Sequence, residues 1–142
     1  MQATTFEEGV EALVARDPRY HRDAYHFLRE SLDFTQREVV QPGRPGNSHV
    51  TAAELLEGTR RHALQAYGPM ALAVLNEWGV FTCEDIGHLV HRLVEQGCFS
   101  VTDGDRLEDF RGGYGFEEAF VQPYRPRGGG REEGAATVTT GR

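Results

Sequence analysis

Residues 81–97, FTCEDIGHLVHRLVEQG, form the most regular stretch of the chain. Thr82 is a suitable N-cap residue, and Phe81 is spaced to pack against Ile86 as a hydrophobic staple. Gly97 follows the last apolar position, as is typical of a helix end. Apolar side chains recur at the spacing of one helical face, namely Ile86, Leu89, Val90, Leu93 and Val94. The stretch therefore predicts an amphipathic helix with one buried and one exposed face.

Similar signals on the N-terminal side of this stretch predict four further helices. Thr5 and Thr51 are each followed three residues later by a glutamate, which is the pattern of a capping box. Pro69 stands where the first turn of a helix accepts proline, and Gly79 ends that segment. The sequence thus predicts a mainly α fold, a compact bundle of about five helices. The expected helical segments are residues 5–15, 20–39, 51–67, 69–78 and 82–96.

The chain has 142 residues, a common size for one domain with one core. We expect a single helical domain over residues 1–124. Residues 41–49 contain two prolines and two glycines, which predicts a mobile loop. Residues 125–142 have almost no apolar side chain to bury, so this segment, with its glycines, arginines and threonines, is expected to be a disordered tail.

The composition excludes several kinds of catalysis. All 15 basic residues are arginines, so mechanisms that need a lysine amine, such as a Schiff base or a Walker phosphate loop, are excluded. The serines, Ser31, Ser48 and Ser100, do not stand in a G-x-S-x-G nucleophile elbow. We predict no catalytic residue and no cofactor. The formal net charge of -7 also disfavours nucleic acid as a partner.

Targeting signals are expected to be absent. No apolar run approaches the ~20 residues that cross a bilayer, and the first residues are acidic where a signal peptide is basic. Cys83 and Cys98 are therefore expected to be reduced thiols. Together these features predict a cytoplasmic protein without a membrane partner.

Three sequence strings together carry a resemblance to a known family. They are DPRYHRDAYHFL at residues 17–28, GPMALAVLNEWGV at residues 68–80 and DFRGGYGFEEAF at residues 109–120. The strings resemble a small, phylogenetically restricted family of bacterial proteins of unknown function, over about residues 5–124. The resemblance implies a bacterial, intracellular origin. It implies no activity, cofactor or catalytic residue.

The order of segments in the C-terminal half is typical of a winged helix-turn-helix. The segments 69–78 and 82–96 would form the two helices, and residues 103–114 would form a small β-hairpin as the wing. The second helix, however, offers Glu84, Asp85, His88 and His91, with Arg92 as its only fixed positive charge. Because acids there would face phosphates, we expect a nucleic-acid-binding regulator only as the alternative function.

The exposed face of the same predicted helix carries a stripe of potential metal ligands, flanked by two cysteines. Their spacing matches no familiar zinc site, and one straight helix cannot wrap these ligands around one ion. We therefore interpret the stripe as a solvated polar face and predict no metal site. The residues concerned are Glu84, His88, His91 and Glu95, with Cys83 and Cys98.

A second polar group stands at the start of the segment 20–39 and comprises His21, Asp23, Tyr25 and His26. A histidine one turn from a carboxylate is a potential general base. The simpler interpretation is a helix N-terminus with aromatic anchors turned inward and Arg/Asp pairs turned outward. An enzyme or metal protein that uses these histidines, or His88 and His91, is the second alternative function.

The third candidate site is a run of aromatic residues among glycines. We expect these side chains to close the helical core as a C-terminal strap, or alternatively to insert Phe116 and Phe120 into a groove on a partner. With no catalytic group found, the sequence favours a non-enzymatic protein-interaction or assembly module that binds a protein partner or itself. The predicted interaction residues are Phe110, Tyr114, Phe116, Phe120 and Tyr124.

Overall fold

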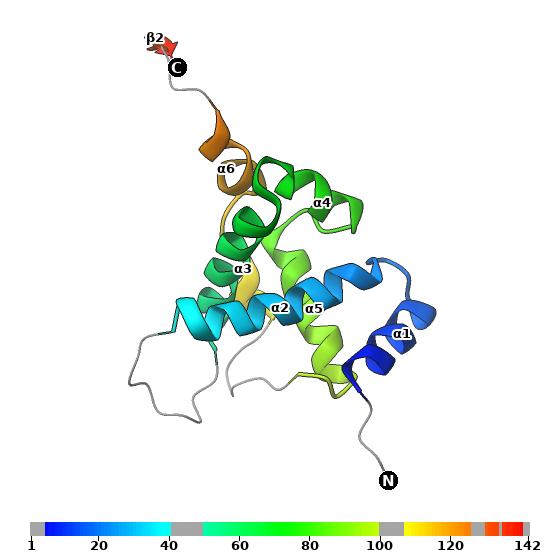
Figure 1. Ribbon diagram of the computed structural model, residues 1–142. Coiled ribbons are helices and arrows are strands. Elements are labelled where there is room, and N and C mark those ends of the chain that lie inside the picture. The colour runs from blue at the N-terminus through cyan, green and yellow to red at the C-terminus, as the bar shows by residue number, and fades with distance from the viewer. Residues whose placement is uncertain (1–4, 41–49, 100–106, 126–129, 134, 141–142) are drawn as a thin grey trace.

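The computed structural model describes residues 5–40, 50–99, 107–125, 130–133 and 135–140. The chain is mainly α-helical, as predicted (Figure 1). None of the helices among the described residues is long and apolar enough to cross a membrane. The elements in chain order are α1 (Phe6–Arg16), α2 (Arg22–Glu38), α3 (Ala52–Tyr67), η1 (Gly68–Met70), α4 (Ala71–Glu77), α5 (Cys83–Glu95), η2 (Leu107–Phe110), α6 (Phe116–Phe120), η3 (Gln122–Tyr124), β1 (Gly130–Glu133) and β2 (Ala135–Thr140).

Capping boxes start three of the helices. Thr5, Thr51 and Thr82 each accept a hydrogen bond from the backbone N–H three residues later, and the acid at that position accepts one in return. Each such cap is worth about 1 kcal/mol. The caps therefore confirm the predicted starts of α1, α3 and α5. Helix α2 begins two residues later than expected, because His21 is its N-cap and the Nδ1 atom of His21 accepts the Asp23 N–H.

Helix α2 packs against α3 and also contacts α1 and α5 (Figure 1). The approach of α2 to α3 is close because Gly58 of α3 lies directly against Thr35 of α2. The Thr35 hydroxyl satisfies itself within α2 by donating to the Ser31 carbonyl at 2.7 Å. A polar side chain can therefore occupy this buried contact without a partner on the other helix.

The connection between α1 and α2 lies against the turn that joins α4 to α5. Gly79 has φ 88°, and a Cβ atom there would lie 2.7 Å from the Arg19 carbonyl oxygen. The His21 N–H donates to the Trp78 carbonyl oxygen at 3.1 Å. These contacts bring the residues before α2 next to the first turn of α5, which is where a polar cluster forms.

The C-terminal segments η2 and α6 cover the bundle on α3, α4 and α5. Figure 1 shows α6 beside α3 and α4, at the end of the molecule where the C-terminal segment departs. The aromatic side chains of Phe110, Phe116 and Phe120 join the same buried cluster as Val10 and Leu13 of α1. The helices from α1 to α6 thus share one hydrophobic core.

The predicted winged-helix hairpin is not supported. Within the predicted wing, residues 103–114, the described part begins at Leu107 and consists of η2 followed by turns, with no strand. The physical reason is burial: Phe110 enters the core, and Gly113 lies against Leu56 and Cys83, so this segment follows the surface of the bundle. A hairpin would instead project from it.

Two predictions concern the loop and the tail. The mobile loop expected at 41–49 lies outside the described residues. In the tail, β1 and β2 pair antiparallel, with an irregular register at Arg131, and Figure 1 draws β2 away from the helices. An isolated two-stranded ribbon is at best marginally stable in water, so the disorder expected for 125–142 stays a prediction.

Candidate functional site

Asp85, in the first turn of α5, is the centre of the densest polar cluster. Its Oδ2 atom accepts the backbone N–H groups of Phe81 at 2.9 Å and of Thr82 at 3.2 Å. Its own N–H donates to the Thr82 hydroxyl at 3.1 Å. The carboxylate therefore satisfies the free donors at the start of α5, where the helix dipole also favours negative charge.

The other oxygen of Asp85 binds the connection between α1 and α2. The hydroxyl of the fully buried Tyr20 donates to Oδ1 at 2.8 Å, and the Arg19 guanidinium donates to the same atom at 3.2 Å. Burial alone would raise the pKa of Asp85, but the hydrogen bonds and the Arg19 charge outweigh it, so the pKa lies below its ordinary value. Burial and the Asp85 charge raise the pKa of Tyr20 far above its ordinary value. Asp85 is thus ionised and Tyr20 neutral at physiological pH.

His88 completes a chain from Asp85 through Tyr20. The Nδ1 atom of His88 lies 3.3 Å from the Tyr20 hydroxyl oxygen. Because the hydroxyl proton already goes to Asp85, His88 must carry a proton on Nδ1 and donate it to Tyr20. In the neutral form, this fixes the tautomer and leaves the lone pair on Nε2. The His88 side chain is 28% exposed, so His88 is the solvent-accessible end of the hydrogen-bonded series Asp85–Tyr20–His88.

Two arginines enclose the Tyr20 ring. The guanidinium groups of Arg19 and Arg92 each lie 5.1 Å from the ring centroid, and Arg92 donates to the Asp17 carboxylate at 2.7 Å. The Tyr25 hydroxyl lies close enough to Arg92 to favour its charged form, although no hydrogen bond of good geometry joins the two. We name this group the Tyr20 cluster, formed by Asp17, Arg19, Tyr20, Asp85, His88 and Arg92.

The Tyr20 cluster is electrically balanced, with two carboxylates and two guanidinium groups. Its hydrogen bonds join the α1–α2 connection to α5. The hydroxyl of the cluster belongs to Tyr20, and its full burial keeps a substrate from reaching it. The cluster therefore connects the residues before α2 to α5. The Nε2 atom of His88 is a solvent-accessible polar atom of the cluster outside these hydrogen bonds.

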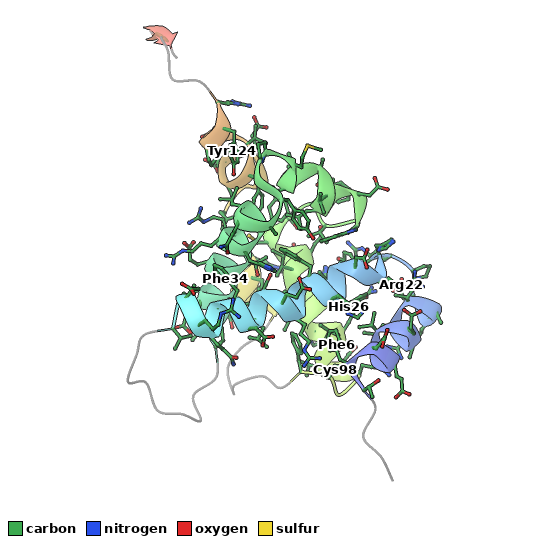
Figure 2. All side chains as sticks on the ribbon, in the orientation of Figure 1. Phe6, Arg22, His26, Phe34, Cys98 and Tyr124 are labelled. Carbon is green, nitrogen blue, oxygen red and sulfur yellow. The ribbon has the colours of Figure 1, made fainter. Side chains whose placement is uncertain are left out.

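The four polar residues at the start of α2 do not gather into one site. His21 caps the helix and its Nδ1 lies 3.6 Å from the Asp23 carboxylate. Tyr25 turns inward, where its ring meets that of Tyr20 edge to face at 6.5 Å. His26 packs instead against the ring of Phe6 at 5.5 Å, as the labelled side chains in Figure 2 illustrate. The four residues thus point toward three different environments.

The stripe of potential metal ligands on α5 is also divided among separate partners. Glu84 pairs with Arg111 at 3.0 Å, His88 belongs to the Tyr20 cluster, and His91 pairs with Glu95 at 3.4 Å. Among the residues that the structure describes, no three histidine, cysteine or acidic side chains are grouped to hold a metal ion.

The two cysteines are free thiols in different places. Cys83 is buried beneath Tyr114, whose backbone N–H and carbonyl oxygen each lie 3.4 Å from its sulfur. Cys98, labelled in Figure 2, is partly buried, and the ring of the next residue, Phe99, stacks on that of Phe6 at 6.0 Å. Burial raises the pKa of both thiols, so both are protonated and weakly reactive.

Sequence reasoning missed a serine–histidine contact at the α2–α3 crossing. The Ser31 hydroxyl lies 2.8 Å from Nδ1 of His62, and the Nε2 atom lies 3.9 Å from the Glu30 carboxylate. This has the composition of a hydrolytic triad, but Ser31 is 0% exposed. The rings of Phe27 and Phe34 stack on His62 at 4.7 Å and 5.6 Å. A substrate cannot reach this hydroxyl, so the contact is part of the core.

An open hollow lies between the start of α1 and the outer face of α2. Arg29 lies 5.0 Å from the centroid of the Phe6 ring and occupies part of this region. The hollow has mixed charge and no enclosed wall. Its lining residues are Thr5, Phe6, Glu7, His26, Arg29, Glu30 and Asp33.

The aromatic strap, residues 110–124, packs largely on the protein's own core. Phe110, Phe116 and Phe120 are buried, and the partly buried Tyr114 donates its hydroxyl to the Leu56 carbonyl at 2.8 Å. Tyr124 is the exception, because 46% of it is exposed. An interaction role for the five aromatics stays a prediction, and only the Tyr124 ring presents a large surface for it.

Three large apolar side chains are exposed in the described part of the chain: Met70 at 60%, Phe81 at 57% and Tyr124 at 46%. Met70 and Tyr124 belong to neighbouring elements, because the Tyr124 hydroxyl lies 3.9 Å from where a Cβ of Gly68 would be, two residues before Met70. Figure 2 shows Tyr124 at the end of the molecule from which the C-terminal segment departs.

Comparison of the chain with family models, with curated proteins and with solved structures finds no match in any of the three.

Proposed function

We propose that this protein is a non-enzymatic protein-interaction or assembly module of the bacterial cytoplasm. The observation that carries the proposal is the joint exposure of Met70 and Tyr124 on neighbouring turns. Large apolar side chains exposed on neighbouring elements, distant in sequence, are typical of binding surfaces.

The chemistry of this surface suits protein recognition. Tyr124 offers a rigid ring with a polar tip, and Met70 offers a flexible, polarisable thioether; both types are enriched in interfaces. Pro69 and Pro123 stand beside them and are also exposed. Since proline has no N–H and a fixed φ, such a surface loses little entropy when a partner binds. We name these four residues the Met70–Tyr124 surface.

The potentially reactive side chains are buried or hydrogen-bonded within the fold, which supports a non-enzymatic role. Ser31 and His62 are enclosed by rings, and Asp85 is saturated by hydrogen bonds. A His-dependent enzyme is the alternative that would use Nε2 of His88 as a base. The lining of the open hollow between α1 and α2 does not include His88.

The alternative function, a regulator that binds nucleic acid, has less support. In the first turn of α5, Glu84 holds Arg111 and Asp85 lies within the Tyr20 cluster. A reading helix would need exposed arginines or amides in this turn, and phosphates would be repelled by its carboxylates.

The proposal is tested by affinity purification of the tagged full chain from its native host. The double variant Met70→Ser/Tyr124→Ser should bind a stoichiometric partner at least about tenfold more weakly than the wild type. A loss of ~1.4 kcal/mol of binding free energy produces this change. The matched control is Phe81→Ser, which removes an equally exposed apolar side chain and should retain the partner.

Two results would contradict the proposal. One is a partner that the double variant retains, or that Phe81→Ser loses to the same extent. The other is a chain without any stoichiometric partner, either foreign or a second copy. Thermal unfolding of each variant checks that the fold is intact, which the exposure of all three side chains leads us to expect.

A further inference from the structure

The Met70–Tyr124 surface continues along α4. Ala73 and Val74 follow Met70 by three and four residues, so they lie on the same side of the helix. Ala73 is exposed and Val74 is only partly buried. An apolar face therefore extends from Tyr124 in η3 over Met70 and along α4.

The α4 side of this surface is acidic. Residues 65–77, which form the end of α3, η1 and α4, contain one charged side chain, that of Glu77. Glu77 stands seven residues after Met70 and therefore on the same side of the helix. It is exposed and has no ion-pair partner among the described residues. This side of the surface thus carries an unpaired negative charge.

The side formed by α6 and η3 is acidic as well. Its charged side chains are two glutamates and one arginine, namely Glu117, Glu118 and Arg125, and all three are exposed. Arg125 donates to the Glu117 carboxylate, so these two charges balance each other. Glu118 has no ion-pair partner in the part of the chain that the structure describes. Both sides of the surface therefore combine exposed apolar side chains with an unpaired carboxylate.

These charges decide which kind of partner fits. A second copy in a two-fold contact would present the same unpaired carboxylates, so like charges would meet across the interface. A partner that carries arginine or lysine beside apolar side chains matches both features of the surface. The exposed ring of Tyr124 favours the same partner, because a guanidinium group stacks well on a tyrosine face.

We propose that the Met70–Tyr124 surface binds a foreign protein through a basic segment with apolar anchors. The anchors contact Met70 and the Tyr124 ring, and arginine or lysine side chains pair with Glu77 and Glu118. The inference rests on the proposed function and adds the chemical class of the partner. Opposite charges at the edge of an interface speed association and select the partner, so binding should weaken as salt screens them.

Selection from a displayed library of random peptides tests the proposal without the native partner. The bait is the full wild-type chain, and the Met70→Ser/Tyr124→Ser chain removes peptides that bind elsewhere. We expect the recovered peptides to combine apolar residues with arginine or lysine. A synthetic peptide of the recovered sequence is then titrated at about 0.05 M and about 0.5 M salt, on either side of the ~0.1 M at which charges are screened over ~10 Å.

Charge variants show whether the local carboxylates matter. Glu77→Lys/Glu118→Lys should bind the peptide at least about fivefold more weakly, mainly through slower association. The matched control is Glu7→Lys/Asp33→Lys, which changes the net charge equally at two exposed acids that line the hollow between α1 and α2. The control should keep the wild-type affinity. If the lysine variant does not fold, Glu77→Gln/Glu118→Gln replaces it and should show a smaller loss in the same direction.

Four results would overturn the inference. They are a selection without peptides that depend on Met70 and Tyr124, recovered peptides that are acidic or uncharged, equal weakening in the charge variant and its control, and a wild-type dimer that Met70→Ser/Tyr124→Ser separates in sedimentation. Purification from the native host distinguishes this failure from that of the proposed function. A stoichiometric partner that needs Met70 and Tyr124 but binds Glu77→Lys/Glu118→Lys equally well would contradict the basic segment and leave the proposed function intact.

Discussion

The α2–α3 crossing and the strap both press a glycine against a neighbouring segment, yet the two contacts differ in what the glycine meets. A Cβ on Gly58 would lie 1.7 Å from the Thr35 hydroxyl oxygen and 3.1 Å from the Thr35 Cα atom. A Cβ on Gly113 would lie 2.9 Å from the tip of Leu56 and 3.0 Å from the sulfur of Cys83. The obstacles at Gly58 include a backbone atom of α2, whereas those at Gly113 are side-chain atoms, and the nearest is the tip of Leu56.

This difference separates a fixed contact from an adjustable one. Two helix backbones in close approach can relax only by moving apart, which disturbs every side chain between them. The strap can relax by small rotations of a few side chains. We therefore expect the crossing to set the stability of the bundle and the strap to be the element that can open or respond to a partner.

The largest predicted effect belongs to Gly58→Ala. Overpacking against Thr35 should destabilise the protein by about 3 kcal/mol, at the severe end for such changes, even though alanine favours a helix by ~1 kcal/mol. Urea unfolding followed by circular dichroism measures the change in the free energy of unfolding. Adding Thr35→Ala to this variant should restore part of the loss, because it removes the nearest atom. A stabilised Gly58→Ala protein would mean that the crossing is as adjustable as the strap.

A smaller effect is predicted for Gly113→Ala. The tip of Leu56 can turn aside, so the expected loss is about 1 to 2 kcal/mol, and the thiol of Cys83 should react faster with a disulfide reagent as the strap opens more often. The matched control is Gly115→Ala, where the new Cβ meets only the flexible end of Glu118. Equal thiol reactivity in the two variants would show that Gly113 does not control docking of the strap.

The helices were predictable because their signals are local. Thr5, Thr51 and Thr82 stand three residues before an acid, and each starts a helix where expected. The prediction of a β-hairpin wing was not supported because the contacts of this segment are distant in sequence. Its glycines are typical of a turn between strands, whereas Gly113 lies in close contact with Leu56 and Cys83. Only the position of Cys83 in three dimensions distinguishes these two roles of glycine.

The polar sites were harder to predict, since their partners are distant in sequence. Tyr20 and Asp85 are 65 positions apart, and Asp85 alone reads as an ordinary capping residue. His88 was recognised as a candidate, but its environment was not, because the tyrosine that orients it comes from the connection before α2. Ser31 and His62 likewise meet only through the crossing of α2 and α3.

The smallest effect is a pH dependence that should distinguish the crossing from the strap, because His62 lies at the crossing and the strap contains no histidine. Burial lowers the pKa of His62; Arg37 adds to this, and Glu30 partly opposes it. The unfolded chain, with a histidine pKa near ~6.5, binds the proton more readily. Stability contributed by neutral His62 is therefore present above about pH 6.5 and is lost as the pH falls from there through the lowered pKa.

Urea unfolding at about pH 7.5 and about pH 5.5, on either side of the unfolded value, tests this dependence. The stability difference between the two pH values should be smaller in His62→Gln than in the wild type. It should stay unchanged in the control His91→Gln, whose histidine is largely exposed beside Glu95. If His62→Gln kept the full pH dependence, the groups that cause it would lie outside the crossing. If the dependence disappears while Cys83 stays equally protected at both pH values, acid weakens the crossing and leaves the strap docked, so the two contacts respond independently.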